Sequence, residues 1–167
     1  MDAVLKFECT AVKKAWRARF PHEAADLLVT QIVVSKHHRM RLFPTPRDAD
    51  AKTGNVPSGT LIDNSIVSPQ DVDFYLVSHP GLKGTSRPTC YTTLFDENGF
   101  SLAQLETLTF NLCHVYARAS RAVSHPAPTF YAHLAAYRAR FYVQIDETGK
   151  FLFAPLHQRL QTSMYYG

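Results

Sequence analysis

The residues best suited to chemistry are the arginines of one stretch, 107–145, which contains neither Asp nor Glu. A guanidinium is costly to bury without an anion, and its planar fork of donors fits a phosphate group. On a helix, His114 and two of these arginines would share a face by their i, i+4, i+7 spacing. The stretch predicts either a phosphate-binding surface or a solvated basic face. Its arginines are Arg118, Arg121, Arg138 and Arg140.

A second group of polar residues lies in the loop SHPGLKGTSRP (78–88), after a predicted strand. Two glycines there let backbone N–H groups approach a ligand, and the polar side chains suit phosphate or hydroxyl contacts. An ordinary turn is the alternative. The candidate residues of this loop are His79, Lys83, Thr85 and Arg87. The basic run 36–41, with Lys36 and Arg41, follows another strand and is either a binding surface or a solvated face.

His133 is a further candidate, within a helix predicted over 127–142. Arg138 lies five residues on, about 140° around the helix, so we expect the two side chains to serve different sites. A histidine hydrogen-bonded at the edge of the core is the alternative. The sequence has no GxSxG, P-loop, dinucleotide-binding or HExxH motif, and its acidic residues form no obvious catalytic pair. We therefore predict no metal site, and we expect the three cysteines to be reduced thiols.

Composition narrows the class of protein. The chain has 167 residues, 46% of them hydrophobic, which is enough for one domain with a real core. The formal net charge of +4 favours an anionic partner such as a nucleic acid. No apolar run reaches the roughly 18 residues of a membrane span, and no leader peptide is visible. We expect a protein of the cytoplasm or nucleus that has no membrane partner.

The elements that must position these residues follow from periodicity and turn signals. We predict an α/β fold in which two long C-terminal helices pack on a mixed sheet. The predicted strands are 27–35, 40–43, 60–67, 73–79, 91–95 and 151–153. The predicted helices are 2–19, 101–121 (with a capping box from Ser101 to Gln104), 127–142 and 156–165. An exposed loop is predicted over 44–58.

Three long segments resemble eukaryotic Argonautes of the Argonaute/Piwi family. They are IVVSKHHRMRLF (32–43), VPSGTLIDNSIVSPQDVDFYLVSHPGLKGTSRPT (56–89) and LTFNLCHVYARASRAVSHPAPTFYAHLAAYRARFY (108–142). The helix at 2–19 and the tail MYYG also fit, so the resemblance covers nearly the whole chain. It implies that residues 1–167 are the C-terminal part of an RNase H-like PIWI domain, without MID, PAZ or N domains.

The resemblance also implies a cutting site that this chain holds only in part. In the family, three carboxylates and a histidine or fourth carboxylate hold divalent metal ions such as Mg²⁺, which cut RNA opposite a guide. The histidine corresponds to His133. The carboxylates belong to segments that lie N-terminal to the helix predicted at 2–19. We therefore expect no cofactor and no cleavage from this chain alone. The alternative is a fragment of a guided, metal-dependent endoribonuclease whose carboxylates lie upstream.

The resemblance implies more of the family's RNA-contacting residues in this chain than of its cutting site. Arg138 matches an arginine near the 5′-phosphate of the guide, and Tyr116, Arg118 and Ser124 match contacts to the first guide phosphates. The positions matching the nucleic-acid channel are Lys36, Arg41, His79, Lys83, Thr85 and Arg87. The implied partners are a small guide RNA, a target RNA and other silencing proteins, with no small-molecule substrate. The chain departs from the family at 90–92 (Cys-Tyr-Thr for His-Tyr-His) and at Phe130, where a tyrosine is common.

Overall fold

The computed structural model describes residues 4–23, 26–81 and 83–166. It divides into two compact units, Met1–Phe110 and Asn111–Gly167. Within the described residues, no helix is both long enough and apolar enough to cross a membrane.

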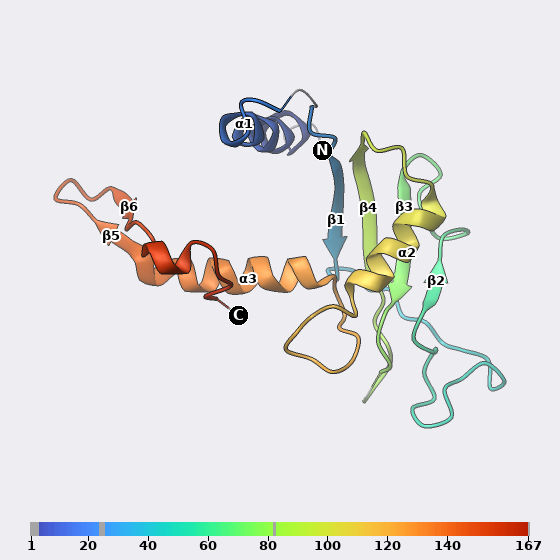
Figure 1. Ribbon diagram of the computed structural model, residues 1–167. Coiled ribbons are helices and arrows are strands. Elements are labelled where there is room, and N and C mark those ends of the chain that lie inside the picture. The colour runs from blue at the N-terminus through green and yellow to red at the C-terminus, as the bar shows by residue number, and fades with distance from the viewer. Residues whose placement is uncertain (1–3, 24–25, 82, 167) are drawn as a thin grey trace. The chain divides into compact units, whose positions relative to one another are not determined.

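The first unit is built on one four-stranded sheet, with the strand order β1-β4-β3-β2 (Figure 1). All three pairings are antiparallel, whereas we expected a mixed sheet. Its strands are β1 (Thr30–Ser35), β2 (Thr60–Ile62), β3 (Val72–Val77) and β4 (Thr89–Asp96). The predicted strands at 60–67 and 27–35 are thus shorter than expected, and the edge strand β1 is partly exposed rather than buried.

The predicted strand at 40–43 is wrong, because the described chain there is irregular. The N–H of Met40 donates to Nδ1 of His38 at 3.2 Å, so a side chain takes the place of a strand partner. The loop at 44–58 is confirmed, but it is not exposed throughout, since Asn55 and Val56 are buried.

Helix α2 (Leu102–Leu112) lies against the sheet and completes the core. The predicted capping box is confirmed: Ser101 N–H donates to Gln104 Oε1 at 2.8 Å, and Gln104 N–H donates to Ser101 Oγ at 3.3 Å. Leu105 of α2 packs with Phe74, Leu76 and Tyr91 of β3 and β4, and all four side chains are buried. The rings of Phe74 and Tyr91 stack with centroids 4.9 Å apart.

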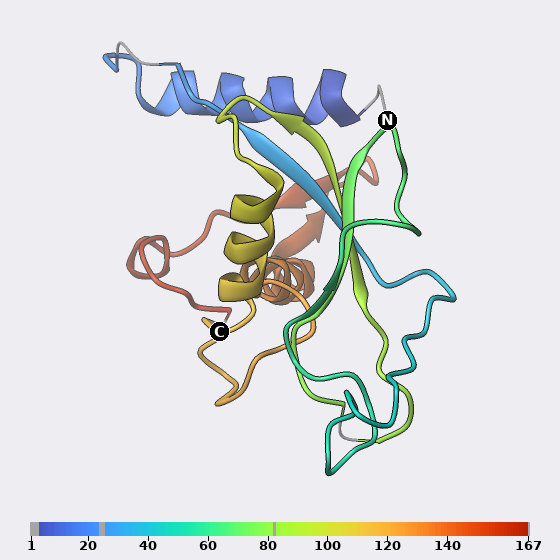
Figure 2. The ribbon, with the colours of Figure 1, turned by 90° about the vertical axis from the view of Figure 1, so that its right-hand side faces the viewer.

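The N-terminal helix begins with a π-helical turn, Val4–Cys9, and continues as α1 (Thr10–Arg19). This confirms the described part of the helix predicted at 2–19. Figure 2 shows α1 lying across the end of the sheet at which β1 begins. An ion pair between Lys13 and Glu97, and a bond from Cys9 Sγ to Gln31 Oε1 at 2.5 Å, join it to the sheet.

The second unit contains α3 (Ala127–Ala139), followed by a 3₁₀ turn, Arg140–Tyr142, which together confirm the helix predicted at 127–142. A hairpin of β5 (Val143–Ile145) and β6 (Phe151–Phe153) comes next. The predicted terminal helix at 156–165 is reduced to one 3₁₀ turn, Gln158–Leu160. The helix predicted at 101–121 ends at Leu112, so its second half is wrong.

Candidate nucleic-acid interface

A cavity of about 360 Å³ in the first unit brings together five residues that we predicted from two separate segments. We call it the basic cavity. It lies where β1 and β3 end, and the loop that precedes β4 closes it. Its lining residues are Lys36, His79, Gly81, Lys83, Thr85, Ser86 and Arg87.

The side chain of Asn55 holds the loop of the basic cavity in shape. Its Nδ2 donates to the carbonyl of Gly84 at 2.8 Å, and its Oδ1 accepts from Ser86 N–H at 2.8 Å. Asn55 and Ser86 are both buried, so the bond between them is shielded from water. A Cβ at Gly81 would lie 2.6 Å from Ser86 Oγ and 2.9 Å from Asn55 Nδ2, so the close approach of the loop requires glycine there.

Arg87 ties the loop to the segment after β1. Its Nη2 donates to the carbonyl oxygens of Lys36 and of His38, the latter at 3.1 Å. These bonds commit one of its nitrogens to the protein's own backbone. Arg87 therefore positions the wall of the basic cavity, a role that the sequence did not indicate.

Two buried polar atoms of the basic cavity have no hydrogen-bond partner among the described residues, Nδ1 of His79 and Oγ of Ser86. Ser86 is 6% exposed. Burial lowers the pKa of His79, and the nearby charge of Lys36 lowers it further. Because a buried polar group without a partner is destabilising, both atoms favour a ligand that can supply the missing bonds.

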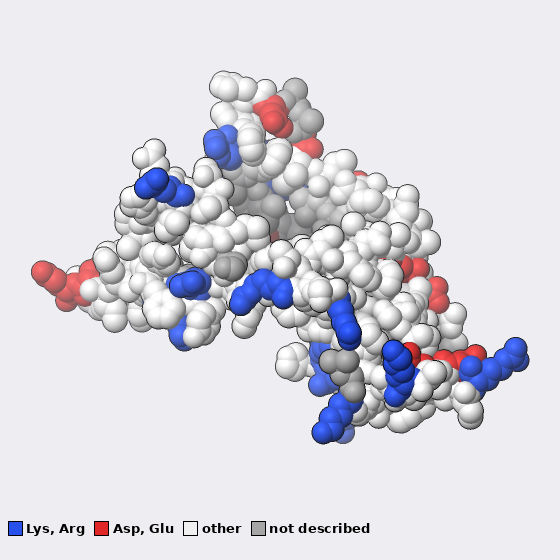
Figure 3. All heavy atoms as spheres, turned by 60° about the horizontal axis from the view of Figure 1, so that its bottom comes forward, with Lys and Arg blue, Asp and Glu red and all other residues white. Residues whose placement is uncertain are grey.

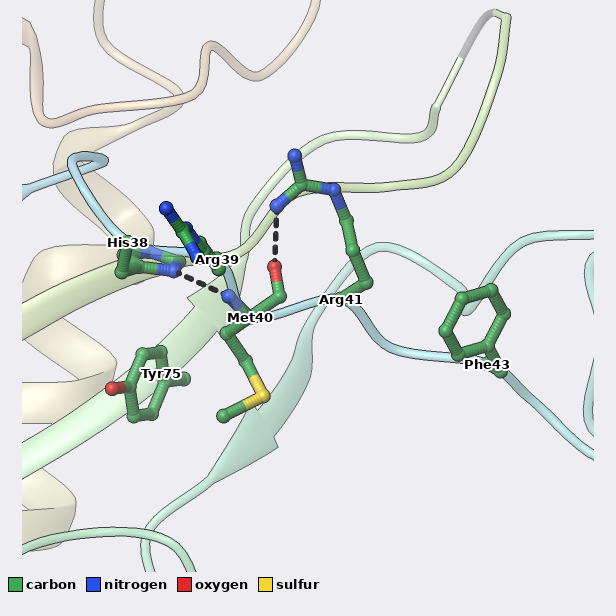
Figure 4. Close-up of a pocket in the computed structure, with 6 residues that line it drawn as sticks. All are labelled: His38, Arg39, Met40, Arg41, Phe43 and Tyr75. Carbon is green, nitrogen blue, oxygen red and sulfur yellow. Dashed lines mark hydrogen bonds between the residues drawn. The ribbon is translucent and has the colours of Figure 1, made fainter.

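A second cavity of about 640 Å³ lies beside the first-unit sheet and holds Arg41, apart from the other predicted residues (Figure 4). We call it the His38–Tyr75 cavity. The ring edge of His38 meets the ring of Tyr75, with centroids 5.3 Å apart and an interplanar angle of 84°. Its lining residues are His38, Arg39, Met40, Arg41, Phe43 and Tyr75.

In the second unit, the segment 113–126 forms a loop that we call the arginine loop. Val123 N–H donates to the carbonyl of Cys113 at 2.9 Å, which closes the loop at its base. Ala117 N–H donates to the hydroxyl of Tyr131 on α3, also at 2.9 Å. The ring of Tyr116 stacks on Phe130 with centroids 4.9 Å apart.

The cationic side chains of the second unit are exposed and do not share one helix face. Arg118 and Arg121 lie in the arginine loop, so the predicted helical alignment with His114 is wrong. Arg138 lies on α3. Among the described residues, none of these three arginines has an ion-pair partner. Arg140 instead places its guanidinium 3.8 Å from the ring centroid of Tyr137 and donates to its hydroxyl at 2.5 Å.

His133 lines a cavity of about 240 Å³ with His125, Thr129 and Phe130. Nδ1 of His125 is 2.9 Å from Ser124 Oγ, so the hydroxyl of this predicted RNA contact already has a neighbour. Within the part of the chain that the structure describes, no three His, Cys, Asp or Glu side chains are placed to hold a metal ion. The three cysteines are not paired with one another.

Sequence reasoning missed Asn55 and Ser86, and it included His38 only as part of the basic run 36–41. Ser86 lay inside the predicted loop, and its small polar side chain was the available signal. The role of Asn55 depends on bonds to residues 29 and 31 positions away, which no local pattern reveals. Figure 3 shows several Lys and Arg side chains gathered at the lower right of this face, with some Asp or Glu side chains beside them.

The Piwi domain family matches residues 1–144. The chain belongs to this family. All the residues that we predicted to contact RNA lie within the matched range. The β5–β6 hairpin begins at its end.

Curated relatives of this Piwi-family chain include plant Argonautes. It is 51% identical to protein argonaute 14 of Oryza sativa subsp. japonica over 142 residues, which covers 83% of this chain and 13% of that protein. It is 48% identical to protein argonaute 5 of Arabidopsis thaliana over 146 residues, which covers 86% of this chain and 14% of that protein. The chain thus spans about one seventh of the length of these relatives.

Solved structures give the same family. The C-terminal lobe of a budding yeast Argonaute matches with a TM-score of 0.76 and 33% identity, over 82% of this chain and 29% of that one. Kluyveromyces polysporus Argonaute with a guide RNA matches with a TM-score of 0.75 and 33% identity, over 82% of this chain and 18% of that one. Drosophila Piwi matches with a TM-score of 0.68 and 29% identity, over 81% of this chain and 18% of that one. The predicted α/β, RNase H-like fold class is confirmed.

Proposed function

We propose that this Piwi-family chain is an RNA-binding part of the RNA-silencing machinery. It contacts phosphates of a guide strand and lines the channel for guide and target, and it does not cut RNA by itself. The similarity to an Argonaute solved with a guide RNA supports a nucleic-acid partner.

The basic cavity is the observation that carries the proposal. Lys36 and Lys83 supply positive charge, and Thr85, Ser86 and His79 supply polar atoms around the same space. Two of those atoms are buried and lack partners within the described residues. Phosphate oxygens are acceptors for Ser86 Oγ–H and for His79 Nδ1–H, and a neutral His79 ring with its proton on Nδ1 can donate this bond. A sugar–phosphate backbone therefore satisfies both the charge and the missing hydrogen bonds.

The arginine loop, together with Arg138 of the neighbouring helix α3, supplies the second contact. Arg118 and Arg138 are exposed and lack ion-pair partners among the described residues, so both can accept a phosphate without breaking a bond. Tyr116 and Ser124 belong to the same loop, next to the aromatic cluster that holds it on α3. We assign these four residues to the phosphates at the 5′ end of the guide.

The alternative function is that of a fragment of a guided endoribonuclease. His133 would then be one ligand of a Mg²⁺ site whose carboxylates come from outside this chain. The residues around His133 do not fit such a site by themselves, because none of the described residues that line its cavity is a carboxylate and Mg²⁺ prefers oxygen ligands. A guided cleavage assay with Mg²⁺ should therefore show no cutting by the 167-residue chain, and cutting would favour the enzyme.

The binding test uses fluorescently labelled single-stranded RNA and the full chain over a range of salt concentrations. The double substitution Lys36→Ala with Lys83→Ala should weaken binding about tenfold and reduce the salt slope by about 1.4, because two phosphate contacts are lost. Arg118→Ala with Arg138→Ala should give a loss of the same order.

The matched control removes Lys52 and Lys150, two exposed lysines that line none of the three cavities described above. This pair changes the net charge by the same amount and should leave affinity within about twofold. Equal losses from both lysine pairs, or binding that does not depend on salt, would overturn the proposal.

A further inference from the structure

The His38–Tyr75 cavity has a lining unlike that of the basic cavity. It combines three rings (His38, Tyr75 and Phe43) with the thioether of Met40 and two guanidiniums. No Asp or Glu is found among the described residues that line it. Figure 4 shows Phe43 on one side, His38 and Tyr75 on the other, and the Met40 side chain between them. A cavity of about 640 Å³ is of the size that holds small planar ligands.

The floor of this cavity is fixed before any ligand binds. Nδ1 of His38 accepts from Met40 N–H at 3.2 Å, so the ring proton is on Nε2, which donates to the carbonyl of Pro88 at 3.1 Å. The carbonyl of His38 in turn accepts from Arg87 at 3.1 Å. Tyr75 lies on β3, between β4 and β2. Both floor rings are therefore held by the sheet and its neighbouring loops.

The rim, in contrast, is exposed. Phe43 is 78% exposed, which leaves a large apolar ring in water on a segment that is otherwise basic. Arg39 and Arg41 are also exposed, and neither has an ion-pair partner among the described residues. Arg41 donates to the carbonyl of Met40 at 2.7 Å, which brings its guanidinium back beside the backbone of Met40 (Figure 4).

This combination selects one kind of ligand. An acidic peptide would use the arginines but not the rings, and an aliphatic segment would use the rings but not the arginines. A nucleotide uses both, because its base stacks on aromatic rings or guanidinium planes while its phosphates meet the cations.

We propose that the His38–Tyr75 cavity takes an unstacked nucleobase of the bound single-stranded RNA. Phe43 and Met40 cover the base, His38 and Tyr75 support it, and Arg39 and Arg41 face the flanking phosphates. The inference rests on the proposed function, since the same strand occupies the basic cavity. The two cavities are adjacent, because Arg87 bonds to both Lys36, which lines one, and His38, which lines the other.

The test separates base from backbone. The full chain is titrated with an oligoadenylate of about ten nucleotides and with an abasic ribose–phosphate chain of the same length. Phe43→Ala should weaken binding of the oligoadenylate about five- to tenfold and leave binding of the abasic chain and the salt slope unchanged. Lys83→Ala should weaken both ligands equally and reduce the slope.

The matched control is Phe153→Ala, which removes an equally exposed ring (71%) from the β5–β6 hairpin and should change neither affinity. Because Phe43 is exposed, its loss should not unfold the chain, and circular dichroism checks this. Equal effects of Phe43→Ala on both ligands would overturn the base site but leave the proposed function intact. If neither ligand binds, the proposed function fails and the base site with it. Displacement of the oligoadenylate by free adenosine monophosphate at equal phosphate concentration would assign the cavity to a free nucleotide and overturn the proposal.

Discussion

The basic cavity of the first unit and the arginine loop of the second carry similar charges but are organised differently. In the basic cavity, a buried amide, Asn55, and a backbone-bound guanidinium, Arg87, fix the loop around a preformed space. In the arginine loop, Arg118 and Arg121 are exposed, and the bonds that hold the loop involve its backbone and the aromatic side chains.

This difference separates two ways of binding a phosphate. A preformed cavity has already lost the conformational entropy of its loop, so binding costs less when the ligand arrives. An exposed guanidinium keeps its rotamers until the ligand orders them, which favours long reach over selectivity. We therefore expect substitutions that loosen the first region to affect stability, and those in the second to affect mainly binding.

The largest effect should come from Asn55→Ala. The substitution leaves the buried N–H of Ser86 and the carbonyl of Gly84 without their partner, so it should lower the free energy of unfolding by about 2–3 kcal/mol. Urea denaturation measures the change. Asn98→Ala is the control, because Asn98 is exposed and its side chain donates to Thr30 Oγ1, whereas its bond to Asp96 comes from the backbone N–H and is kept. Its cost should be below about 1 kcal/mol. Equal costs would show that the cavity loop is not held as the structure indicates.

Tyr131→Phe tests the arginine loop and should have a smaller effect. It removes the hydroxyl that accepts from Ala117 N–H, while the ring contacts with Tyr116 remain. Because this bond is exposed, the cost should be about 0.5–1 kcal/mol. Hydrogen exchange at Ala117 should speed up about two- to fivefold, whereas exchange in the loop of the basic cavity should not change. Faster exchange in both loops would remove the distinction between the regions.

The pH dependence of stability should give the smallest effect. Burial lowers the pKa of His38 and of His79 from 6.5, so the unfolded chain binds more protons than the folded chain just below that pH. Stability should therefore be fully present above about pH 7.5 and decline as the pH falls through 6.5. The affinity for RNA should change in the opposite direction and rise as the pH falls, because a phosphate favours the protonated form of His79. His38→Gln should flatten the stability profile, and an unchanged profile would rule out this origin.

The first unit was largely predictable because its strands and the capping box of α2 are local patterns. The helix predicted to 121 failed because the tertiary structure overrode periodicity. Cys113 is fully buried and its carbonyl accepts from Val123, so the chain turns away from the helical path just after Leu112. The spacing of Leu112, Val115 and Ala119 fits a helix, and nothing local marks the exit.

The residues of the basic cavity also divide into a group that is close in sequence and one that only the fold brings near. The loop residues Lys83 and Thr85 are close in sequence, and Lys36 joins them only through the antiparallel pairing of β1 with β4. Of the β5–β6 hairpin, only β6 was predicted from the sequence. β5 has three residues and was missed, although the turn residues Asp146 and Gly149 indicated a hairpin. The Asp146 carboxylate accepts from Thr148 N–H and Lys150 N–H at 2.9 Å, and Gly149 has a φ of +82°.

The compact turn at 50–55 has a consequence for insertions and deletions. Asp50 N–H donates to the carbonyl of Asn55, and its own carbonyl accepts from Gly54 N–H, both at 2.8 Å. A peptide tag inserted before Asp48 leaves this closed turn intact, while deletion of a single residue inside it withdraws the Asn55 amide from Gly84 and Ser86. One polar loop therefore contains both a part that tolerates insertions, before Asp48, and a part that does not tolerate deletions, the turn at 50–55. An epitope or label should be placed in the first part.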